Sequence, residues 1–329
     1  MKISVAMCTY NGAEFLPAQL ESILAQSQTP NEIVVCDDGS TDGTRALLEK
    51  FAAASTVPVS LHFNETNLGS VKNFEKAIRL CNGDIIALSD QDDVWRHNKL
   101  KLIEEAFNES TTTGLVFSDA EIVDENLRPL NRRMWNEIGF DAQKRKLLRN
   151  GRALEVLVTG WTVTGATMAF RSRFVNICLP IPDRIAMIHD GWIALTIAAV
   201  AGVVAIDEPL VQYRQHERQQ IGAPGQIQMA PGPRGLEKFE TAFKRENSSA
   251  DLYKILETLE ERLLAYTGVY DIRKALSFVG DYSFHLNVRA NLPQRRRLSR
   301  VPSILRELLS LRYHEYANGF KSAAKDLVS

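Results

Sequence analysis

Short apolar runs alternate with helix-like segments through the first third of the chain, and this alternation constrains the fold more than any other feature. Five runs have the length and composition of buried strands: residues 3–7, 33–36, 57–63, 84–88 and 115–119. Between them, apolar side chains recur at helical spacing. This order predicts an α/β fold, with a mostly parallel sheet flanked by helices and joined by right-handed crossovers.

Polar side chains follow three of these runs directly. Thr9, Tyr10 and Asn11 follow the first run, Asp37 and Asp38 the second, and Asp90 and Asp92 the fourth. In such sheets, ligands bind beyond the carboxyl ends of the strands, near the point where strand order reverses. We therefore expect these side chains to gather at one edge of the sheet and to form a ligand site there.

Three carboxylates, Asp90, Asp92 and Asp93, lie within four residues. Crowded like charges raise the cost of ionising one another, so this arrangement does not favour folding by itself. A hard divalent cation such as Mn²⁺ or Mg²⁺ removes the conflict, and Mg²⁺ is usually held by one or two carboxylates plus substrate phosphates. Asp90 and Asp92 are therefore predicted to be the protein's part of a metal–diphosphate site. The alternative is a solvated acidic turn in which Asp93 caps the next helix.

Composition places the chain among soluble globular proteins. The 329 residues are 45% hydrophobic and 24% charged, which is enough for a sizeable core. The net charge of −1 argues against a nucleic-acid-binding protein. The four cysteines are widely separated, which favours free thiols in a reducing compartment over disulfides or zinc sites. We expect no signal peptide, and the longest uncharged run, residues 192–206, is too short to span a bilayer.

The second half of the chain is less regular. A strand is predicted at residues 163–170, and two short strands, 203–206 and 210–213, surround Pro209. Residues 222–235 contain four glycines and three prolines, which indicates a mobile loop or linker. We expect one domain over residues 1–221 and a mostly helical region over 236–329, interrupted at Pro293 and Pro302.

Three motifs, in this order and spacing, resemble family two glycosyltransferases. They are residues 5–12 (VAMCTYNG), 34–44 (VVCDDGSTDGT) and 89–95 (SDQDDVW). The resemblance covers roughly residues 1–220. It implies that the first domain has a GT-A fold and transfers a sugar from a nucleotide-sugar, with inversion at the anomeric carbon. The sequence of residues 89–95 most resembles that of rhamnosyltransferases of bacterial surface polysaccharides.

The resemblance assigns a nucleotide site. Tyr10 lies against the base, which suits an aromatic ring, and Thr9 and Asn11 shape the loop. Asp38 accepts the ring N–H of uracil or thymine, and Asp37 orients its neighbour or the ribose. The alternative for this acidic pair is helix capping. Lys72 adds positive charge near the nucleotide, or is a solvated surface lysine.

The resemblance also assigns metal ligands. Asp92 is the direct ligand, and Asp90 contacts the metal or the ribose. His216 completes the metal shell or contacts the diphosphate; the alternative is a structural histidine. Relatives often continue the histidine motif with Gly-Asn-Asn, whereas this chain has Glu217, Arg218 and Gln219.

Inversion needs a base on the side of the sugar opposite the diphosphate, where it takes the proton of the attacking hydroxyl. Asp190, in the segment His-Asp-Gly-Trp at 189–192, matches the carboxylate that does this in the family. The alternative is a simple helix cap. Thr164 and Gly165 match the acceptor-side loop, where glycine lets the backbone approach the sugars. We place Trp192 on the acceptor side as well.

Residues 289–312 hold seven arginines against one glutamate, interleaved with leucine and isoleucine. This pattern favours a basic amphipathic helix on anionic lipid, which would suit a lipid-linked acceptor. The alternative is a helix packed on its own domain or on the partner in an oligomer.

The sequence therefore predicts a cytoplasmic enzyme, peripheral to the inner face of the cytoplasmic membrane if this helix binds lipid. Its donor would be a UDP- or TDP-sugar, its cofactor Mn²⁺ or Mg²⁺, and its acceptor a glycan or lipid-linked glycan. The rival functions are a nucleotidyltransferase or phosphatase with a clustered-aspartate metal site, and a non-catalytic protein that binds sugar nucleotides.

Overall fold

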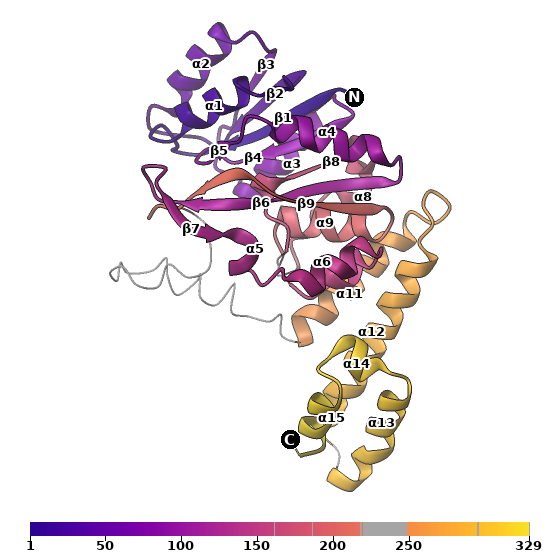
Figure 1. Ribbon diagram of the computed structural model, residues 1–329. Coiled ribbons are helices and arrows are strands. Elements are labelled where there is room, and N and C mark those ends of the chain that lie inside the picture. The colour runs from indigo at the N-terminus through magenta and orange to yellow at the C-terminus, as the bar shows by residue number, and fades with distance from the viewer. Residues whose placement is uncertain (161, 186, 218, 220–248, 295, 329) are drawn as a thin grey trace. The chain divides into compact units, whose positions relative to one another are not determined.

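The computed structural model describes residues 1–160, 162–185, 187–217, 219, 249–294 and 296–328 (Figure 1). The chain divides into two compact units. The first comprises Met1–Ile181 and Met187–Glu246, and the second Pro182–Ala186 and Asn247–Ser329. The predicted linker at residues 222–235 lies outside the described residues.

Four parallel strands form one half of the sheet in the first unit. They are β1 (Ile3–Thr9), β2 (Glu32–Asp37), β3 (Val59–Phe63) and β4 (Ile85–Ser89), in the order β3–β2–β1–β4. Every residue of β1 and β4 is buried, as expected for strands covered on both faces. Strand order reverses at β1, which has β2 on one side and β4 on the other. The α/β fold predicted from the sequence is thus confirmed.

The other half of the sheet is mixed. Strand β8 (Met168–Arg171) is antiparallel to β4 and to β6 (Thr113–Val123), while β9 (Gly202–Arg214) is parallel to β6. The short strand β5 (Val94–Trp95) pairs with β9, and β7 (Pro129–Arg133) pairs with β6, both antiparallel. The acidic segment between β4 and β5 is therefore fixed at both ends by the sheet.

Two details of the predicted strands were wrong. The strand expected at 163–170 begins only at Met168, because Gly165–Thr167 forms a 3-10 turn, η1. The two strands expected around Pro209 are one continuous strand, β9. Proline lacks an N–H, and the ladder between β6 and β9 accommodates it with register shifts on either side of Asp119.

Helices lie on both faces of this sheet (Figure 1). Helices α1 (Leu16–Leu24), α2 (Thr44–Ala54) and α4 (Lys99–Glu109) share a core with the odd-numbered residues of β1. Helix α3 (Ser70–Leu80) packs on β1 and β2, and α9 (His189–Ala198) packs on α3, β6 and β9. The remaining short helices are α5 (Met134–Glu137), α6 (Ala142–Arg149), α7 (Ala153–Val158), η2 (Ser172–Phe174) and α8 (Val175–Cys178).

The second unit is helical. It contains α11 (Ser249–Leu264), α12 (Arg273–Asn291), α13 (Arg297–Leu309), α14 (Arg312–Tyr316) and α15 (Phe320–Val328). Helix α12 ends before Pro293, as predicted, but Pro302 lies inside α13 instead of breaking it. Pro302 is the sixth residue of α13, where it removes one backbone hydrogen bond of the helix. No helix in the described ranges has the length and apolar character needed to cross a membrane.

Candidate functional site

A cavity of about 200 Å³ lies in the first unit, where β1, β2 and β4 end. Its wall contains predicted site residues from each of these strand ends and from the second half of the unit: Thr9, Tyr10, Asp38, Asp90, Asp92, Thr164, Gly165 and Asp190. The other lining residues are Cys8, Ser70, Asn73, Phe74, Gln91, Met134, Ile138, Val163, Ile188, His189, Tyr213 and Gln219. The strand ends therefore gather their polar side chains around one space, as expected for a parallel sheet.

Side chains from two neighbouring loops hold the loop after β1. The Gln91 amide accepts from the Tyr10 N–H at 2.8 Å and donates to the Tyr10 carbonyl oxygen at 3.0 Å. Asn11 has a left-handed backbone, with φ of 46°, and its N–H donates to Ser40 Oγ while its Oδ1 accepts from the Thr41 N–H. The Tyr10 side chain is 42% exposed. The loop thus presents an accessible aromatic ring on a fixed backbone.

Asp37 has a structural role in the turn after β2. Its carboxylate accepts from Thr9 Oγ1 at 2.8 Å and from the N–H and hydroxyl of Ser40, and it does not line the cavity. The cap position of α2 is Gly43, and Asp42, directly before it, accepts from the Thr44 N–H at 2.9 Å. The capping alternative considered for Asp37 and Asp38 therefore does not describe either residue.

Asp38 lines the cavity and at the same time orders the loop that precedes α3. Its Oδ1 accepts from the Leu68 N–H and Asn64 Nδ2, both at 2.8 Å, and its Oδ2 accepts from the Gly69 N–H at 2.9 Å. Gly69 has φ of 81°, a conformation that favours glycine. A carboxylate has about four lone-pair sites, so these three donors leave acceptor capacity toward the cavity.

The acidic segment after β4 carries more negative charge than its surroundings neutralise. Burial, and then the charges of Asp92 and Asp190, raise the pKa of Asp90 to about 7. Burial and the same kind of crowding raise the pKa of Asp93 well above its usual range. Asp93 does not cap α4, whose cap position is Asn98; its Oδ1 instead accepts from the Arg214 N–H at 3.0 Å. Each acid thus destabilises the ionised form of its neighbours.

The end of β9 brings His216 to this segment. His216 Nε2 lies 3.0 Å from Asp92 Oδ2, and the imidazole packs against the Phe15 ring with centroids 4.4 Å apart. Arg214 supports the contact, since its Nε donates to the Asp92 carbonyl oxygen at 2.6 Å. Residues separated by more than 120 positions therefore form one cluster, and the predicted proximity of His216 to the acidic segment is seen in the structure.

Lys99 is a fully buried lysine behind the acidic segment. Its Nζ donates to the Ala166 carbonyl oxygen at 2.6 Å and lies 3.6 Å from the centre of the Trp95 ring. Burial lowers the pKa of Lys99 well below its usual range, while Asp93 and Asp90 act in the opposite direction. The lysine thus contacts both the η1 turn, through Ala166, and the Trp95 ring of β5.

Asp190 lies in the first turn of α9 and faces the η1 turn. Its Oδ2 accepts from the Gly165 N–H at 2.9 Å, and its Oδ1 accepts from the Gly191 N–H at 2.6 Å. The side chain is 6% exposed and lines the cavity together with Thr164 and Gly165. The carboxylate is thus oriented by backbone donors, and it does not cap the helix, whose cap position is Ile188.

Trp192 and Lys72 lie away from this wall. Trp192 is fully buried, and its indole N–H donates to the Cys178 carbonyl oxygen at 2.8 Å. Its side chain therefore presents no exposed surface for the predicted contact with an acceptor. Lys72 lies on α3, where its Nζ is 3.4 Å from Glu75 Oε2 and 3.5 Å from the Ile181 carbonyl oxygen. Lys72 does not line the cavity, so its predicted nucleotide contact stays a prediction.

The donor set fits a divalent cation that a ligand helps to hold. Asp90 and Asp92 offer carboxylate oxygens and His216 an imidazole nitrogen, all of which Mn²⁺ accepts. Among the described residues, no group of three or more histidine, cysteine, aspartate or glutamate side chains is arranged as a metal site. An incomplete protein shell is the usual arrangement for Mg²⁺, which takes phosphate oxygens as further ligands. Burial, and then the charges of Asp92 and Asp190, disfavour the ionised form of Asp90, and a bound cation would stabilise that form.

Sequence reasoning missed four supporting residues: Gln91, Lys99, His189 and Arg214. Gln91 and Arg214 lie inside segments that the sequence singled out, so their positions were visible although their partners were not. Lys99 looks like an ordinary lysine at the start of a helix, and only its burial distinguishes it. His189 precedes Asp190 directly, and nothing in its spacing shows that its ring lines the cavity.

Comparison with known proteins places this geometry in a family. The model of glycosyl transferase family 2 matches residues 4–176, more than half of the chain. A Nostoc protein described as an uncharacterized glycosyltransferase is 30% identical over 66% of this chain and 65% of its own length. The dTDP-rhamnosyl transferase RfbG of Shigella flexneri is 28% identical over 66% of this chain and 74% of its own length.

A solved structure gives the same fold. TarS of S. aureus, crystallised as residues 1–349 with UDP-GlcNAc, aligns with 99% of this chain and 91% of its own, at a TM-score of 0.54 and 16% identity. The matched segments cover less than two thirds of several curated relatives, namely 65%, 38% and 34% of their lengths. Fold and family therefore agree, while donor and acceptor have to be argued from the cavity.

Proposed function

Because the chain belongs to glycosyl transferase family 2, with a GT-A fold, we propose that it transfers a sugar from a nucleoside-diphosphate sugar to a hydroxyl of a glycan or lipid-linked glycan. We propose further that transfer inverts the anomeric carbon and requires Mn²⁺ or Mg²⁺. The observation that carries this proposal is one cavity that brings together Tyr10 and Asp38, Asp90 and Asp92, and Asp190.

The nucleotide end of the proposed site is formed by Tyr10 and Asp38. The exposed ring of Tyr10 is suited to stacking on a base, and its backbone is fixed by Gln91. Asp38 retains acceptor capacity for a ring N–H of uracil or thymine beside its three internal donors. Asp37 acts by fixing the turn and, through Ser40, the loop that carries Asn11.

The diphosphate is proposed to lie next to Asp90 and Asp92. Two phosphates would otherwise meet carboxylates of the same charge, so binding requires positive charge from elsewhere. Asp92, with Asp90 and His216 beside it, would hold a divalent cation, which would supply that charge and stabilise the departing diphosphate. Arg214 holds the acidic segment through the Asp92 carbonyl oxygen, and Lys99 holds the η1 turn through the Ala166 carbonyl oxygen.

Asp190 is proposed to be the general base. Backbone N–H groups of Gly165 and Gly191 orient its carboxylate in the cavity wall. A carboxylate held in this way can take the proton from an acceptor hydroxyl as that oxygen attacks the anomeric carbon. The attacking oxygen forms the new glycosidic bond, the bond to the diphosphate breaks, and the nucleoside diphosphate leaves.

The direct test is a thermal-shift panel of UDP-glucose, UDP-GlcNAc, dTDP-rhamnose and GDP-mannose, each with Mn²⁺ or with EDTA. dTDP-rhamnose is included because the Shigella relative is described as a dTDP-rhamnosyl transferase. Binding to the native state alone raises the melting temperature, so one UDP- or TDP-sugar should raise it with Mn²⁺ and much less with EDTA.

Product analysis then separates the proposed activity from its rivals. A glycosyltransferase releases nucleoside diphosphate and leaves the sugar on an acceptor or on water. Release of nucleoside triphosphate or of inorganic phosphate would instead indicate a nucleotidyltransferase or phosphatase. Binding without turnover on any lipid-linked or free glycan acceptor would favour a non-catalytic binding protein.

A membrane-facing surface on α13 is also proposed, with the inner face of the cytoplasmic membrane as its location. Leu298, Leu305 and Leu309 are 88%, 52% and 84% exposed and lie on one side of the helix, at spacings of seven and four. Arg297 and Arg306 are exposed on the same helix. Exposed leucines beside arginines suit a surface of anionic lipid.

The structure also reduces the number of arginines that this surface can present to lipid. Arg289 forms an ion pair with Asp326, Arg300 is buried and donates to backbone carbonyls, and Arg312 pairs with Asp281. Fewer arginines than the sequence count suggested are therefore available to lipid. We expect the chain to sediment with phosphatidylglycerol-containing vesicles and not with pure phosphatidylcholine vesicles.

The double change Leu298→Ser and Leu309→Ser should abolish this sedimentation, while Leu130→Ser, on an exposed leucine of β7, should leave it intact. If the wild-type chain does not sediment with anionic vesicles, the lipid proposal fails. If the double change instead dissociates an oligomer in sedimentation velocity, the leucines form a protein interface.

A further inference from the structure

His189 is a buried polar side chain whose hydrogen-bonding groups face no protein partner. It is 5% exposed, and neither ring nitrogen has a hydrogen-bond partner among the described residues. Within those residues, other buried side chains also contain unpartnered atoms, namely Asp93, Thr196 and His285, but none of these three lines the cavity. Buried polar groups are nearly always paired, so an unpaired one at a binding cavity indicates a ligand group.

The ring is held in a fixed position. It stacks on Phe74 of α3, with centroids 4.2 Å apart and an angle of 20° between the planes. A Cβ atom on Gly165 would lie 3.1 Å from His189 Nε2 and 3.6 Å from Asp190 Oδ2. Both polar atoms therefore converge beside Gly165, and the absence of a side chain there keeps the space between them open.

The charge of the ring limits what it can bind. Burial lowers the pKa of His189, although the nearby Asp190 acts in the opposite direction, so the imidazole is neutral at pH 7. A neutral imidazole offers one donor and one acceptor. A sugar hydroxyl matches this pair, since it also donates and accepts. A phosphate only accepts, and the acids at this cavity disfavour it further.

We propose that His189 and Asp190 form a hydroxyl-binding subsite beside Gly165, in which the imidazole of His189 holds one sugar hydroxyl next to the sugar group that contacts Asp190. This inference rests on the proposed transferase function and names a contact within it. The hydroxyl belongs either to the donor sugar or to the acceptor sugar, and the two sources predict different behaviour in the experiment below.

The experiment follows the ¹⁵N resonances of the imidazole rings. The chain has six histidines, and the spectrum of His189→Asn identifies the resonances of His189 by their loss. Spectra are recorded with Mg²⁺ and, in turn, UDP, the nucleotide-sugar that stabilises the protein in the thermal-shift panel, and UDP plus methyl glycosides of glucose, GlcNAc and rhamnose. His62, on β3 and outside the cavity wall, serves as an internal reference.

A shift of the His189 resonances with the nucleotide-sugar but not with UDP supports a donor-sugar contact. A shift only when a methyl glycoside is added to the UDP complex supports an acceptor contact. If the nucleotide-sugar binds by calorimetry and no addition moves the His189 resonances, the subsite is refuted while the transferase proposal stands. If no nucleotide-sugar binds at all, the proposed function fails and this inference fails with it.

Kinetics of two variants separate the hydrogen bond from packing. His189→Phe keeps a ring on Phe74 but removes both nitrogens, and should lower kcat/KM by about 10-fold or more, as expected for loss of a hydrogen bond in a buried site. His189→Asn restores a donor and an acceptor and should recover part of the loss. His62→Phe, a matched change on β3, should leave kcat/KM within about twofold.

Equal activity of His189→Phe and the wild type would refute the contact. So would a loss in His189→Phe that is accompanied by weaker binding of UDP alone, because that would indicate general distortion of the cavity. The melting temperature of each variant, and its calorimetric Kd for UDP with Mg²⁺, provide this check.

Discussion

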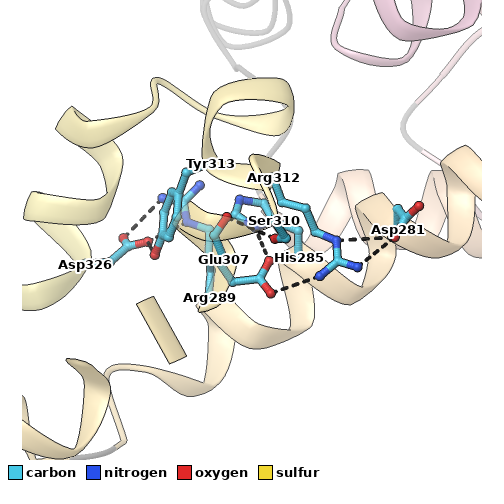
Figure 2. A network of polar contacts seen from close by, with 8 residues as sticks. All are labelled: Asp281, His285, Arg289, Glu307, Ser310, Arg312, Tyr313 and Asp326. Carbon is cyan, nitrogen blue, oxygen red and sulfur yellow. Dashed lines mark hydrogen bonds and ion pairs between the residues drawn. The ribbon is translucent and has the colours of Figure 1, made fainter. Parts of the chain in front are cut away.

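Acidic side chains cluster in two regions of this chain, and the two clusters are neutralised differently. In the helical unit, Glu307 is buried and pairs with His285 at 2.8 Å and with Arg312 at 3.2 Å (Figure 2). Asp326 accepts two hydrogen bonds from the Arg289 guanidinium, at 2.6 and 3.1 Å. Every acid drawn in this network has a basic partner within the chain.

The cavity in the first unit has the opposite arrangement. Within the described residues, no arginine or lysine forms an ion pair with Asp90, Asp92 or Asp190. Asp190 relies on backbone N–H groups and Asp92 on His216. The buried Lys99 donates to a carbonyl oxygen instead of to a carboxylate. Burial, together with the negative charges of Asp92 and Asp190, raises the pKa of Asp90 to about 7.

This difference distinguishes acids whose charge is neutralised within the fold from acids whose charge is left for a ligand to neutralise. A charge with its partner in the same chain contributes to packing and to a defined geometry. Carboxylates crowded together without a cation destabilise one another, and such groups cluster at functional sites. The two clusters should therefore respond in opposite ways to the loss of one charge.

The largest effect is expected for Asp190→Asn. The amide keeps the size of the side chain and one oxygen that can accept from Gly165, but it cannot take a proton from an acceptor. Transfer should fall about 10²- to 10⁴-fold, the usual contribution of a general base. Calorimetric Kd values for the nucleotide-sugar should stay within about threefold. Retention of most of the transfer rate would assign the base elsewhere.

A pair of matched changes, Asp92→Asn and Glu307→Gln, tests the comparison directly. Asp92→Asn should leave the stability of the metal-free protein unchanged or raise it, because it removes a crowded charge. It should also abolish the Mn²⁺-dependent rise in melting temperature and lower transfer at least about 100-fold. Glu307→Gln should destabilise by about 3–5 kcal/mol, since Arg312 then loses its buried carboxylate partner.

Spectroscopy assigns these effects to the two units. All four tryptophans, at 95, 135, 161 and 192, belong to the first unit. Tryptophan fluorescence therefore reports unfolding of the first unit, whereas far-UV circular dichroism also reports the helices of the second. Glu307→Gln should lower the midpoint of the circular dichroism transition in urea while leaving kcat/KM within about twofold. If Asp92→Asn destabilised the metal-free protein as strongly as Glu307→Gln, the proposed distinction between the clusters would be lost.

The fold of the first half was predictable because local patterns decide it. Apolar runs such as 33–36 and 84–88 have the length and composition of buried strands, and they match β2 and β4. The strand at 163–170 was harder, because its pattern does not show that Gly165–Thr167 turns toward Asp190. That turn depends on a contact with a residue 25 positions away, which periodicity does not encode.

The site was predictable at its strand ends and less so elsewhere. The position of Asp38 follows from strand order alone, because carboxyl ends of parallel strands share an edge. The burial of Trp192 does not follow from sequence, since an aromatic residue at a helix start suits either a core or a ligand site. The role of His189 depends on which atoms remain unpaired after packing, and no sequence pattern records that.

The pH dependence of stability gives a moderate effect with a defined sign. Asp90 has a pKa of about 7 in the folded state, above the value of about 4 expected in the unfolded chain. Between these values Asp90 binds more protons in the folded state, so its contribution to the free energy of unfolding should decrease as pH rises from about 4 to 7. The slope from one proton is at most about 1.4 kcal/mol per pH unit.

Urea unfolding of the metal-free protein at pH 5, 6 and 7 measures this slope. Asp90→Asn should reduce it, while the raised pKa of Asp93 contributes a remainder of the same sign. Carboxyls with lowered pKa values, such as Glu32 and Asp42, act in the opposite direction but below this window. His62, His189 and His285 have lowered pKa values and act in the opposite direction within this window, so the test is the difference in slope between the wild type and Asp90→Asn. An unchanged slope in Asp90→Asn would contradict the proposed crowding of charge.

The smallest effect is expected where neutralisation is complete. In Tyr313→Phe, Asp326 loses the 2.8 Å hydrogen bond from the Tyr313 hydroxyl but keeps both bonds from Arg289. The free energy of unfolding should fall by only about 1 kcal/mol, the net value of one hydrogen bond, because no charge is left without a partner. The circular dichroism midpoint in urea measures this change, with an unaltered kcat/KM as control. A loss as large as that of Glu307→Gln would mean that the hydroxyl, and not the guanidinium, holds Asp326 in place.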